Sequence, residues 1–310
     1  MDYFDFAPLD RWISRLALGS LVFNLEALDN TFAMLDRWRE LGGNLVDTAH
    51  VYAGGNSERA LGRYFAERGG REEIVLLTKG AHHNQDRKRV TAEDIASDLR
   101  DSLARLQTDY VDLYLLHRDD PSVPVGPIME ALNQHVRAGR VRALGASNWS
   151  IPRLEEANAY AEARGLAPFV VSSPHFSLAV PNEPIWPGCE PARDAASMAW
   201  YARTQLPLFA WSSQARGFFS GRFTPENREN ETVARCFYSE ANWERLRRAR
   251  ELGEQRGFSV IQVALAWVLA QEMNVFPLIG PANVAELESC VGALELKLTP
   301  EEGRWLALDQ

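Results

Sequence analysis

Short runs of apolar residues alternate along the whole chain with longer segments in which apolar residues recur at helical spacing. The apolar runs that predict β-strands are residues 16–19, 44–47, 74–79, 111–117, 142–146, 169–173, 208–211 and 275–280. The segments that predict helices are residues 31–41, 91–106, 127–138, 151–163, 191–204 and 259–270. Parallel strands need a crossover segment between them, usually a helix. Eight such repeats therefore predict an α/β fold, a (β/α)8 TIM barrel.

Residues at the ends of the predicted helices support this pattern. Thr91 begins the helix at 91–106 as its cap, and glycines follow helices at Gly42, Gly69 and Gly139. The rival fold, an open doubly wound sheet, needs a G-x-G-x-x-G sequence after its first strand, and the chain has none. We therefore expect one domain over residues 1–310. Its one long irregular stretch, residues 213–239, has the length of a functional loop.

Composition excludes several classes of protein. With 46% hydrophobic and 24% charged residues, the chain is neither disordered nor fibrous. The three cysteines are far apart and lack metal or redox spacing, which suits the cytoplasm. The N-terminus does not resemble a signal peptide, and the longest apolar run, residues 263–270, is too short to span a membrane. A net charge of −9 without a basic stripe disfavours nucleic acid and anionic membranes as partners.

Polar residues end several of the predicted strands. Asp47, Lys79 and His117 each close an apolar run, and Tyr52 follows the first of them by five residues. Each residue alone has a structural explanation: a turn residue, an exposed lysine, a core histidine or a packing tyrosine. Together they favour a catalytic site, because the carboxyl ends of all barrel strands meet at one rim and unpaired charges near a core are costly.

Four segments resemble the aldo-keto reductase superfamily: N-L-V-D-T-A-H-V-Y at 44–52, L-L-T-K at 76–79, V-D-L-Y-L-L-H at 111–117 and G-A-S-N-W at 145–149. S-E-R-A-L-G at 57–62 and L-T-P-E-E at 298–302 fit as well, so the resemblance runs from about Leu16 to the C-terminus. The resemblance implies a barrel that binds a nicotinamide cofactor without a Rossmann domain. It also implies the reduction of an aldehyde or ketone to an alcohol, or the reverse reaction.

The resemblance also implies catalytic roles. Tyr52 would protonate the carbonyl oxygen during hydride transfer, and His117 would hydrogen-bond and orient the carbonyl. Lys79, paired with Asp47, would lower the pKa of the Tyr52 phenol from about 10. No metal is required. His82 and His83 are interpreted as loop residues near the substrate, with solvated surface residues as the alternative.

The cofactor site is implied in the same way, with Trp211 stacking on the nicotinamide, Ser147 and Asn148 binding its carboxamide, and residues 212–217 wrapping the pyrophosphate. The residues assigned to the cofactor are Gly19, Ser20, Asp47, Ser147, Asn148, Ser173, Trp211, Ser212, Ser213, Gln214, Gly217, Arg222, Gly280, Ala282 and Asn283. Ser173 departs from the family pattern, in which a longer Gln or Asn ends the sixth strand.

The family's preference for NADP(H) depends on a cation that pairs with the 2′-phosphate. Ala282 and Asn283 carry no charge where the family often has that cation, and Glu288-Ser289-Cys290 departs from the family's acidic-Asn pair. Arg216 and Arg222 in the pyrophosphate loop are alternative cations. We expect NADP(H) to be preferred and NAD(H) to be accepted.

Two other functions stay open at this point. One is a non-catalytic or redox-sensing regulatory subunit on the same scaffold, similar to the potassium-channel β-subunits. The other is a barrel isomerase or lyase that does not use nicotinamide. Turnover of nicotinamide with simple aldehydes distinguishes them. The sequence predicts a small-molecule carbonyl or alcohol substrate, but neither its identity, nor the direction of the reaction in the cell, nor the oligomeric state.

Overall fold

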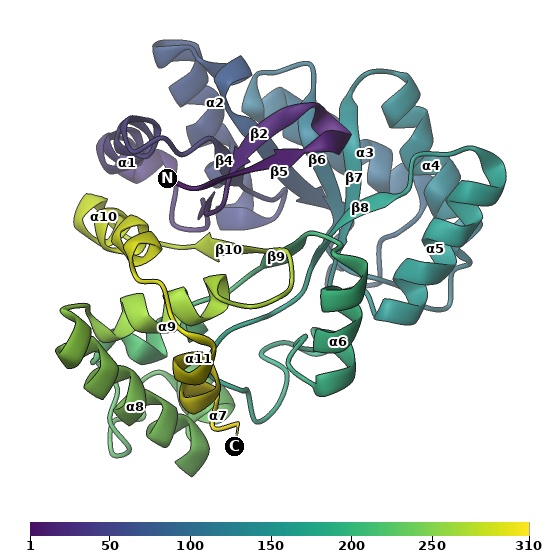
Figure 1. The fold of residues 1–310 in the computed structure, drawn as a ribbon. Helices are drawn as coiled ribbons and strands as arrows, with labels where there is room; N and C mark the ends of the chain where they lie inside the picture. Colours follow the sequence, from purple (N-terminus) through teal and green to yellow (C-terminus); the bar gives the residue numbers. More distant parts are fainter. Residues whose placement is uncertain (310) are drawn as a thin grey trace. The chain divides into compact units, whose positions relative to one another are not determined.

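Eight parallel strands form a closed barrel in the computed structural model, which describes residues 1–309 (Figure 1). Their order around the barrel is β10-β3-β4-β5-β6-β7-β8-β9. The bounds are β3 (Ala17–Gly19), β4 (Leu45–Asp47), β5 (Val75–Gly80), β6 (Val111–Leu116), β7 (Val141–Ser147), β8 (Phe169–Ser173), β9 (Leu208–Ala210) and β10 (Val275–Ile279). Each overlaps a strand expected from the sequence, and the predicted (β/α)8 barrel is confirmed.

The chain divides into two compact units. The first comprises Met1–Ser173 and Ala282–Val284, and the second comprises Pro174–Pro281 and the segment from Ala285 onward. A single domain over 1–310 stays a prediction.

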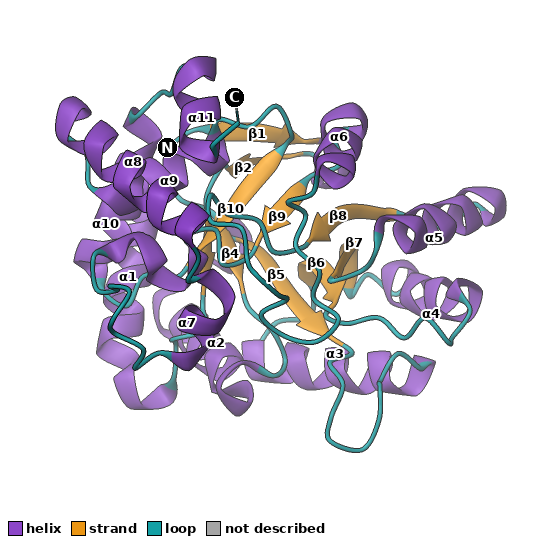
Figure 2. Cartoon of the chain, turned by 90° about the horizontal axis from the view of Figure 1, so that it is seen from below, coloured by secondary structure: helices purple, strands orange, loops and turns teal. Residues whose placement is uncertain are grey.

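In the first unit, strands β3 to β8 pair in parallel, so their carboxyl ends point the same way. Gly19 pairs with Asp47, Lys79 pairs with Leu115, and Ser147 pairs with Ser173. The helices of this unit are α1 (Leu28–Glu40), α2 (Asn56–Arg68), α3 (Ala92–Leu106), α4 (Val125–Arg137) and α5 (Ile151–Arg164). Helices α2 to α5 pack against one another in sequence order, and α3, α4 and α5 contact β5, β7 and β8 (Figure 2). This layer of helices lines up the strand ends, and the polar residues that follow them, on one rim.

The helix ends follow from local chemistry. Thr91 caps α3, because its hydroxyl accepts a hydrogen bond from the backbone N–H of Asp94. Gly42, Gly69 and Gly139 all have positive φ angles, as expected for residues that end helices in the left-handed conformation.

Several elements were not expected from the sequence. They are the antiparallel hairpin of β1 (Tyr3–Phe6) and β2 (Arg11–Ser14), and the helices α7 (Glu231–Phe237), α8 (Glu240–Arg256), α10 (Val284–Gly292) and α11 (Pro300–Ala307); of α2, only the end at Gly69 was expected. Helix α7 lies inside the stretch that was expected to be irregular, residues 213–239. It has only 7 residues, too few to show a helical repeat of apolar positions, and is set by its cap, Asn230.

The second unit contains β9, β10, α6 (Ala195–Thr204), α7, α8, α9 (Val260–Leu269) and α11. Strands β9 and β10 pair in parallel, and α8 packs on α9. The irregular segment before α6 is tied to β9 through His175, which forms isolated bridges with Pro191 and Trp211. Among residues 1–309, none of the helices has the length and apolar character needed to cross a membrane.

Candidate active site

A buried ion pair joins the ends of two neighbouring strands of the first unit. Asp47 ends β4, and Lys79 lies one residue before the end of β5. The Lys79 ammonium donates to the Asp47 carboxylate, to the backbone carbonyl of Thr48 (3.0 Å) and to the Tyr52 hydroxyl (3.2 Å). The Lys79 and Asp47 side chains are only 1% and 3% exposed. Because all three ammonium protons have acceptors, the charge is tolerated in a buried position.

Tyr52 reaches this pair from a short 3-10 turn that follows β4. The turn is built on left-handed backbone, with Ala53, Gly54 and Gly55 at φ angles of 49°, 62° and 87°. The Tyr52 ring centre lies 4.9 Å from the Lys79 ammonium. The His117 ring meets the Tyr52 ring edge to face, with centroids 5.8 Å apart. Residues following three different strands therefore lie in one cluster, as the sequence predicted.

The electrostatics of Tyr52 differ from the expectation. Burial raises the pKa of the Tyr52 phenol above 10, and Asp47 adds to this effect, although Lys79 opposes it. The expectation that Lys79 brings this pKa below its ordinary value is therefore wrong, because burial of the phenol outweighs the nearby ammonium. Burial also raises the pKa of Asp47 against the effect of Lys79. Tyr52 is thus a protonated phenol at neutral pH.

His117 is an uncharged imidazole. Burial holds its pKa well below 6.5, and the neighbouring Lys79, His82 and Arg118 lower it further. Its Nδ1 is buried without a hydrogen-bond partner among residues 1–309. A neutral imidazole has one N–H to donate, so His117 can act as a hydrogen-bond donor to a carbonyl oxygen.

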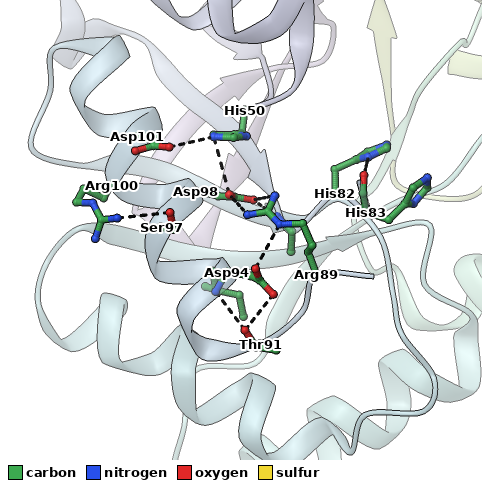
Figure 3. Close-up of polar contacts among 12 residues, drawn as sticks. His50, His82, His83, Arg89, Thr91, Asp94, Ser97, Asp98, Arg100 and Asp101 are labelled. Carbon is green, nitrogen blue, oxygen red and sulfur yellow. Dashed lines mark hydrogen bonds and ion pairs between the residues drawn. The ribbon is translucent and has the colours of Figure 1, made fainter. Parts of the chain in front are cut away.

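The adjacent histidines His82 and His83, whose roles the sequence left undecided, have different surroundings in the structure. The ring of His82 packs edge to face on His117, with centroids 4.9 Å apart. His83 is exposed, and its backbone carbonyl lies 2.7 Å from Nδ1 of His82 (Figure 3). His82 therefore contacts the quartet formed by Asp47, Tyr52, Lys79 and His117, whereas the His83 side chain is exposed and its ring lies 4.4 Å from that of His82.

Charged residues on α2 and α3 bind residues that adjoin the quartet in the sequence. Glu58 is fully buried and accepts a hydrogen bond from the Thr78 hydroxyl (2.7 Å). It also pairs with Arg105 (3.2 Å), which donates to the backbone carbonyl of His50 (2.9 Å). Glu58 belongs to a motif seen in the sequence, but no sequence signal indicated its partner Arg105.

The expected nicotinamide residues of the first unit lie at the strand ends, where their side chains bind neighbouring strands. The Ser147 hydroxyl donates to the carbonyl of Ser173 (2.8 Å), and the Asn148 side chain donates to the carbonyl of His117 (3.1 Å). Ser20 shares a hydrogen bond with the buried Ser57 (2.7 Å). These contacts fix the strand ends relative to one another.

Two further candidates, Ala282 and Asn283, follow β10 in sequence but belong to the first unit. The carbonyl of Ala282 accepts a hydrogen bond from the Asn30 side chain (3.0 Å).

The second unit contains the expected stacking residue and the pyrophosphate loop. Trp211 directly follows β9, and its ring contacts those of His175 (5.0 Å between centroids) and Trp186 (5.4 Å). Ala215, Arg216 and Gly217 have left-handed φ angles of 49°, 53° and 83°. The N–H groups of Ala215 and Gly217 donate to the carbonyls of Ser212 and Gln214 (2.8 and 2.9 Å), which holds the loop in tight turns.

Side chains fix this loop within the second unit. Ser213 donates to the carbonyl of Leu278 (2.9 Å), and Gln214 hydrogen-bonds the Cys290 thiol (3.4 Å). A Cβ on Gly217 would lie 2.9 Å from the Arg222 guanidinium, so Arg222 is next to the loop backbone. A Cβ on Gly280, after β10, would meet no atom within 4 Å. Among residues 1–309, no group of three or more His, Cys, Asp or Glu side chains is placed to hold a metal ion.

Comparisons with known proteins show which family the chain is similar to. The model of the aldo/keto reductase family matches residues 15–306. An uncharacterized oxidoreductase of Bacillus subtilis, YrpG, is 31% identical over 95% of this chain and 91% of its own length. A norsolorinic acid reductase of Emericella nidulans is also 31% identical, over 94% of this chain and 76% of its own length.

Among solved structures, a thermostable aldo-keto reductase, Tm1743, has the same fold with a TM-score of 0.78. It covers 100% of both chains at 24% identity, and supports the fold alone. The family match and the relatives together establish an oxidoreductase that acts on carbonyl compounds with a nicotinamide cofactor. The chain belongs to the aldo/keto reductase family.

Proposed function

We propose that this enzyme reduces an aldehyde or ketone to an alcohol, or runs the reverse reaction, with Tyr52 as the proton donor. The observation that carries the proposal is the hydrogen bond of 3.2 Å from the buried Lys79 ammonium to the Tyr52 hydroxyl. The bound nicotinamide supplies the hydride. The protein supplies the proton, the orientation of the carbonyl and the compensation of charge.

Each residue of the quartet has a separate task. The N–H of the neutral His117 donates to the carbonyl oxygen and orients it. As negative charge develops on this oxygen, the Tyr52 hydroxyl transfers its proton to it, which leaves a phenolate on Tyr52. The Lys79 ammonium stabilises that phenolate, and Asp47 holds Lys79 in place. Because the resting phenol is protonated, Tyr52 has a proton to give at neutral pH.

The proposed cofactor residues include the loop at 212–217 for the diphosphate, and Trp211, directly after β9, for the nicotinamide ring. Ser147, Asn148 and Ser173 would serve the carboxamide. We propose NADP(H) as the preferred cofactor, with NAD(H) accepted. Arg222 is the cation that suits a 2′-phosphate, because the guanidinium of Arg216 lies over the Trp186 ring, 5.4 Å from its centre.

The substrate class that we propose is an apolar carbonyl compound rather than a sugar. Leu21 and Val22, in the loop after β3, are 56% and 42% exposed, and Val51, next to Tyr52, is 37% exposed. Apolar residues exposed beside a polar catalytic cluster suit an apolar ligand.

The substitution Tyr52→Phe tests the proposal. It removes the proton donor but keeps the ring, so kcat should fall at least about 100-fold. Titrations followed by tryptophan fluorescence should show that Tyr52→Phe binds NADPH as tightly as the wild type does. The same titrations of the wild type should show weaker binding of NADH than of NADPH. A variant that keeps more than a third of the wild-type rate would falsify the role of Tyr52, and equal or tighter binding of NADH would contradict the cofactor preference alone.

A further inference from the structure

We propose that His82 is a positioning residue for His117. Its ring holds the His117 imidazole in the orientation in which the imidazole donates to the substrate carbonyl. This inference rests on the proposed function, because it assigns His82 a role in the same reaction.

Two aromatic rings confine the His117 imidazole. Its Nδ1 is buried and has no hydrogen-bond partner within residues 1–309. The terminal torsion of a histidine is broad, so an imidazole without such a bond rotates unless its neighbours confine it. Two rings do so edge to face: Tyr52 at 5.8 Å and 78°, and His82 at 4.9 Å and 79°. Of these, the His82 ring is the closer.

The His82 ring has a defined orientation of its own. Its Nδ1 lies 2.7 Å from the backbone carbonyl of His83. A carbonyl oxygen only accepts hydrogen bonds, so Nδ1 must carry the proton. Burial lowers the pKa of His82, and the cations Arg118 and Arg89 contribute in the same direction. His82 is therefore a neutral ring with its proton on Nδ1.

The backbone of His82 is anchored to helix α3 (Figure 3). Ala81, just before it, has a left-handed φ of 59°, and its N–H donates to the buried carboxylate of Asp98 (2.9 Å). Arg89 binds the same carboxylate with two hydrogen bonds, 3.1 and 2.6 Å long. The connection from β5 to α3 is thus fixed on both sides of His82 by one aspartate.

This anchoring gives His82 the rigidity that positioning requires. A static ring 4.9 Å from His117 limits its rotation and keeps water from its buried face. Loss of the ring would leave space beside His117, so that the imidazole turns away from the carbonyl and becomes more hydrated. Small misplacements of a catalytic group cost up to about 100-fold in rate.

Three variants of the full chain test the inference. For His82→Ala we expect kcat/KM for the carbonyl substrate to fall about 10- to 100-fold, with unchanged binding of NADPH. His82→Phe keeps a ring at this position and should stay within about 3-fold of the wild type. His83→Ala keeps the backbone carbonyl next to Nδ1 of His82 but removes a ring whose centroid lies 4.4 Å from that of His82, so it should reduce kcat/KM less than His82→Ala does.

The second readout is the NMR titration of His117 without substrate. In His82→Ala its pKa should move upward toward the ordinary value, because burial is reduced, whereas His82→Phe should leave it low. An unchanged His117 titration and unchanged kcat/KM in His82→Ala would overturn the inference. So would a His82→Phe variant as impaired as His82→Ala, since a polar role would then be indicated.

One more variant keeps the inference testable if His82→Ala does not fold, and a comparison with Tyr52→Phe separates failure of the inference from failure of the proposed function. If His82→Ala does not fold, Arg89→Gln loosens the same connection from outside, and should shift the His117 titration in the same direction. Failure of the proposed function would appear differently. The Tyr52→Phe variant would then be fully active, while His82→Ala would still raise the pKa of His117.

Discussion

Lys79 shows how a single buried charge is maintained. Burial by itself would lower the pKa of this lysine, but Asp47 and Tyr52 together raise it above its ordinary value. The ammonium is therefore fixed as a cation beside the phenol. Its importance for Tyr52 lies in stabilising the phenolate after proton transfer, not in ionising the phenol beforehand.

Lys79→Met should abolish or strongly reduce carbonyl reduction and leave Asp47 as an unpaired buried carboxylate. We expect the free energy of unfolding to fall by about 3–5 kcal/mol in urea denaturation. Lys79→Met combined with Asp47→Asn should recover most of this loss. The control Lys88→Met removes an exposed partner of Asp120 and should cost less than about 1 kcal/mol. Unchanged kinetics of Lys79→Met between about pH 6 and about pH 9 would contradict the assigned role.

At the scale of elements, Gly80 allows the end of strand β5 to approach β6 and α3 closely, because glycine has no side chain. A Cβ on Gly80 would lie 1.9 Å from the hydroxyl oxygen of Tyr114 on β6 and 3.0 Å from Cβ of Asp98 on α3. Gly80 directly follows Lys79, so this close approach also determines where the end of β5 presents the ammonium.

Gly80→Ala should therefore displace the end of β5, with an unfolding free energy lower by about 1–3 kcal/mol and a reduced kcat. Adding Tyr114→Phe removes the nearest clashing atom and should restore part of both losses. The control Gly303→Ala adds a methyl group in α11, where no atom lies within 4 Å, and should be neutral or slightly stabilising. Full stability and activity of Gly80→Ala would show that the strand end adapts.

For the whole molecule, buried neutral histidines link stability to pH. His175 is 1% exposed, packs on Trp211 and Phe237, and burial lowers its pKa to about 3. In the unfolded chain the same imidazole has a pKa near about 6.5. Below that pH the unfolded chain binds a proton that the folded protein does not, so acid favours unfolding.

The free energy of unfolding should therefore have its full value above about pH 7. As the pH drops below about 6.5, His175 should lower this free energy by up to about 1.4 kcal/mol per pH unit. His117, whose pKa is also lowered, adds to this slope. Urea denaturation at several values between about pH 5 and about pH 7.5 measures it, above the range in which most carboxylates titrate. His175→Phe keeps a ring in contact with Trp211 and should reduce the slope, whereas an equal slope would assign the effect to other groups.

The sequence by itself determined the barrel and the grouping of Asp47, Tyr52, Lys79 and His117. Alternating strand and helix periods are local properties, and a closed parallel barrel brings all strand ends to one rim whatever the details of packing. Only the tertiary structure decided the direction of the Tyr52 pKa and the distinct positions of His82 and His83. It also decided the partnership of Glu58 with Arg105. These properties depend on distances of a few ångströms between elements far apart in the chain, and on how much water burial removes, which no local pattern of residues encodes.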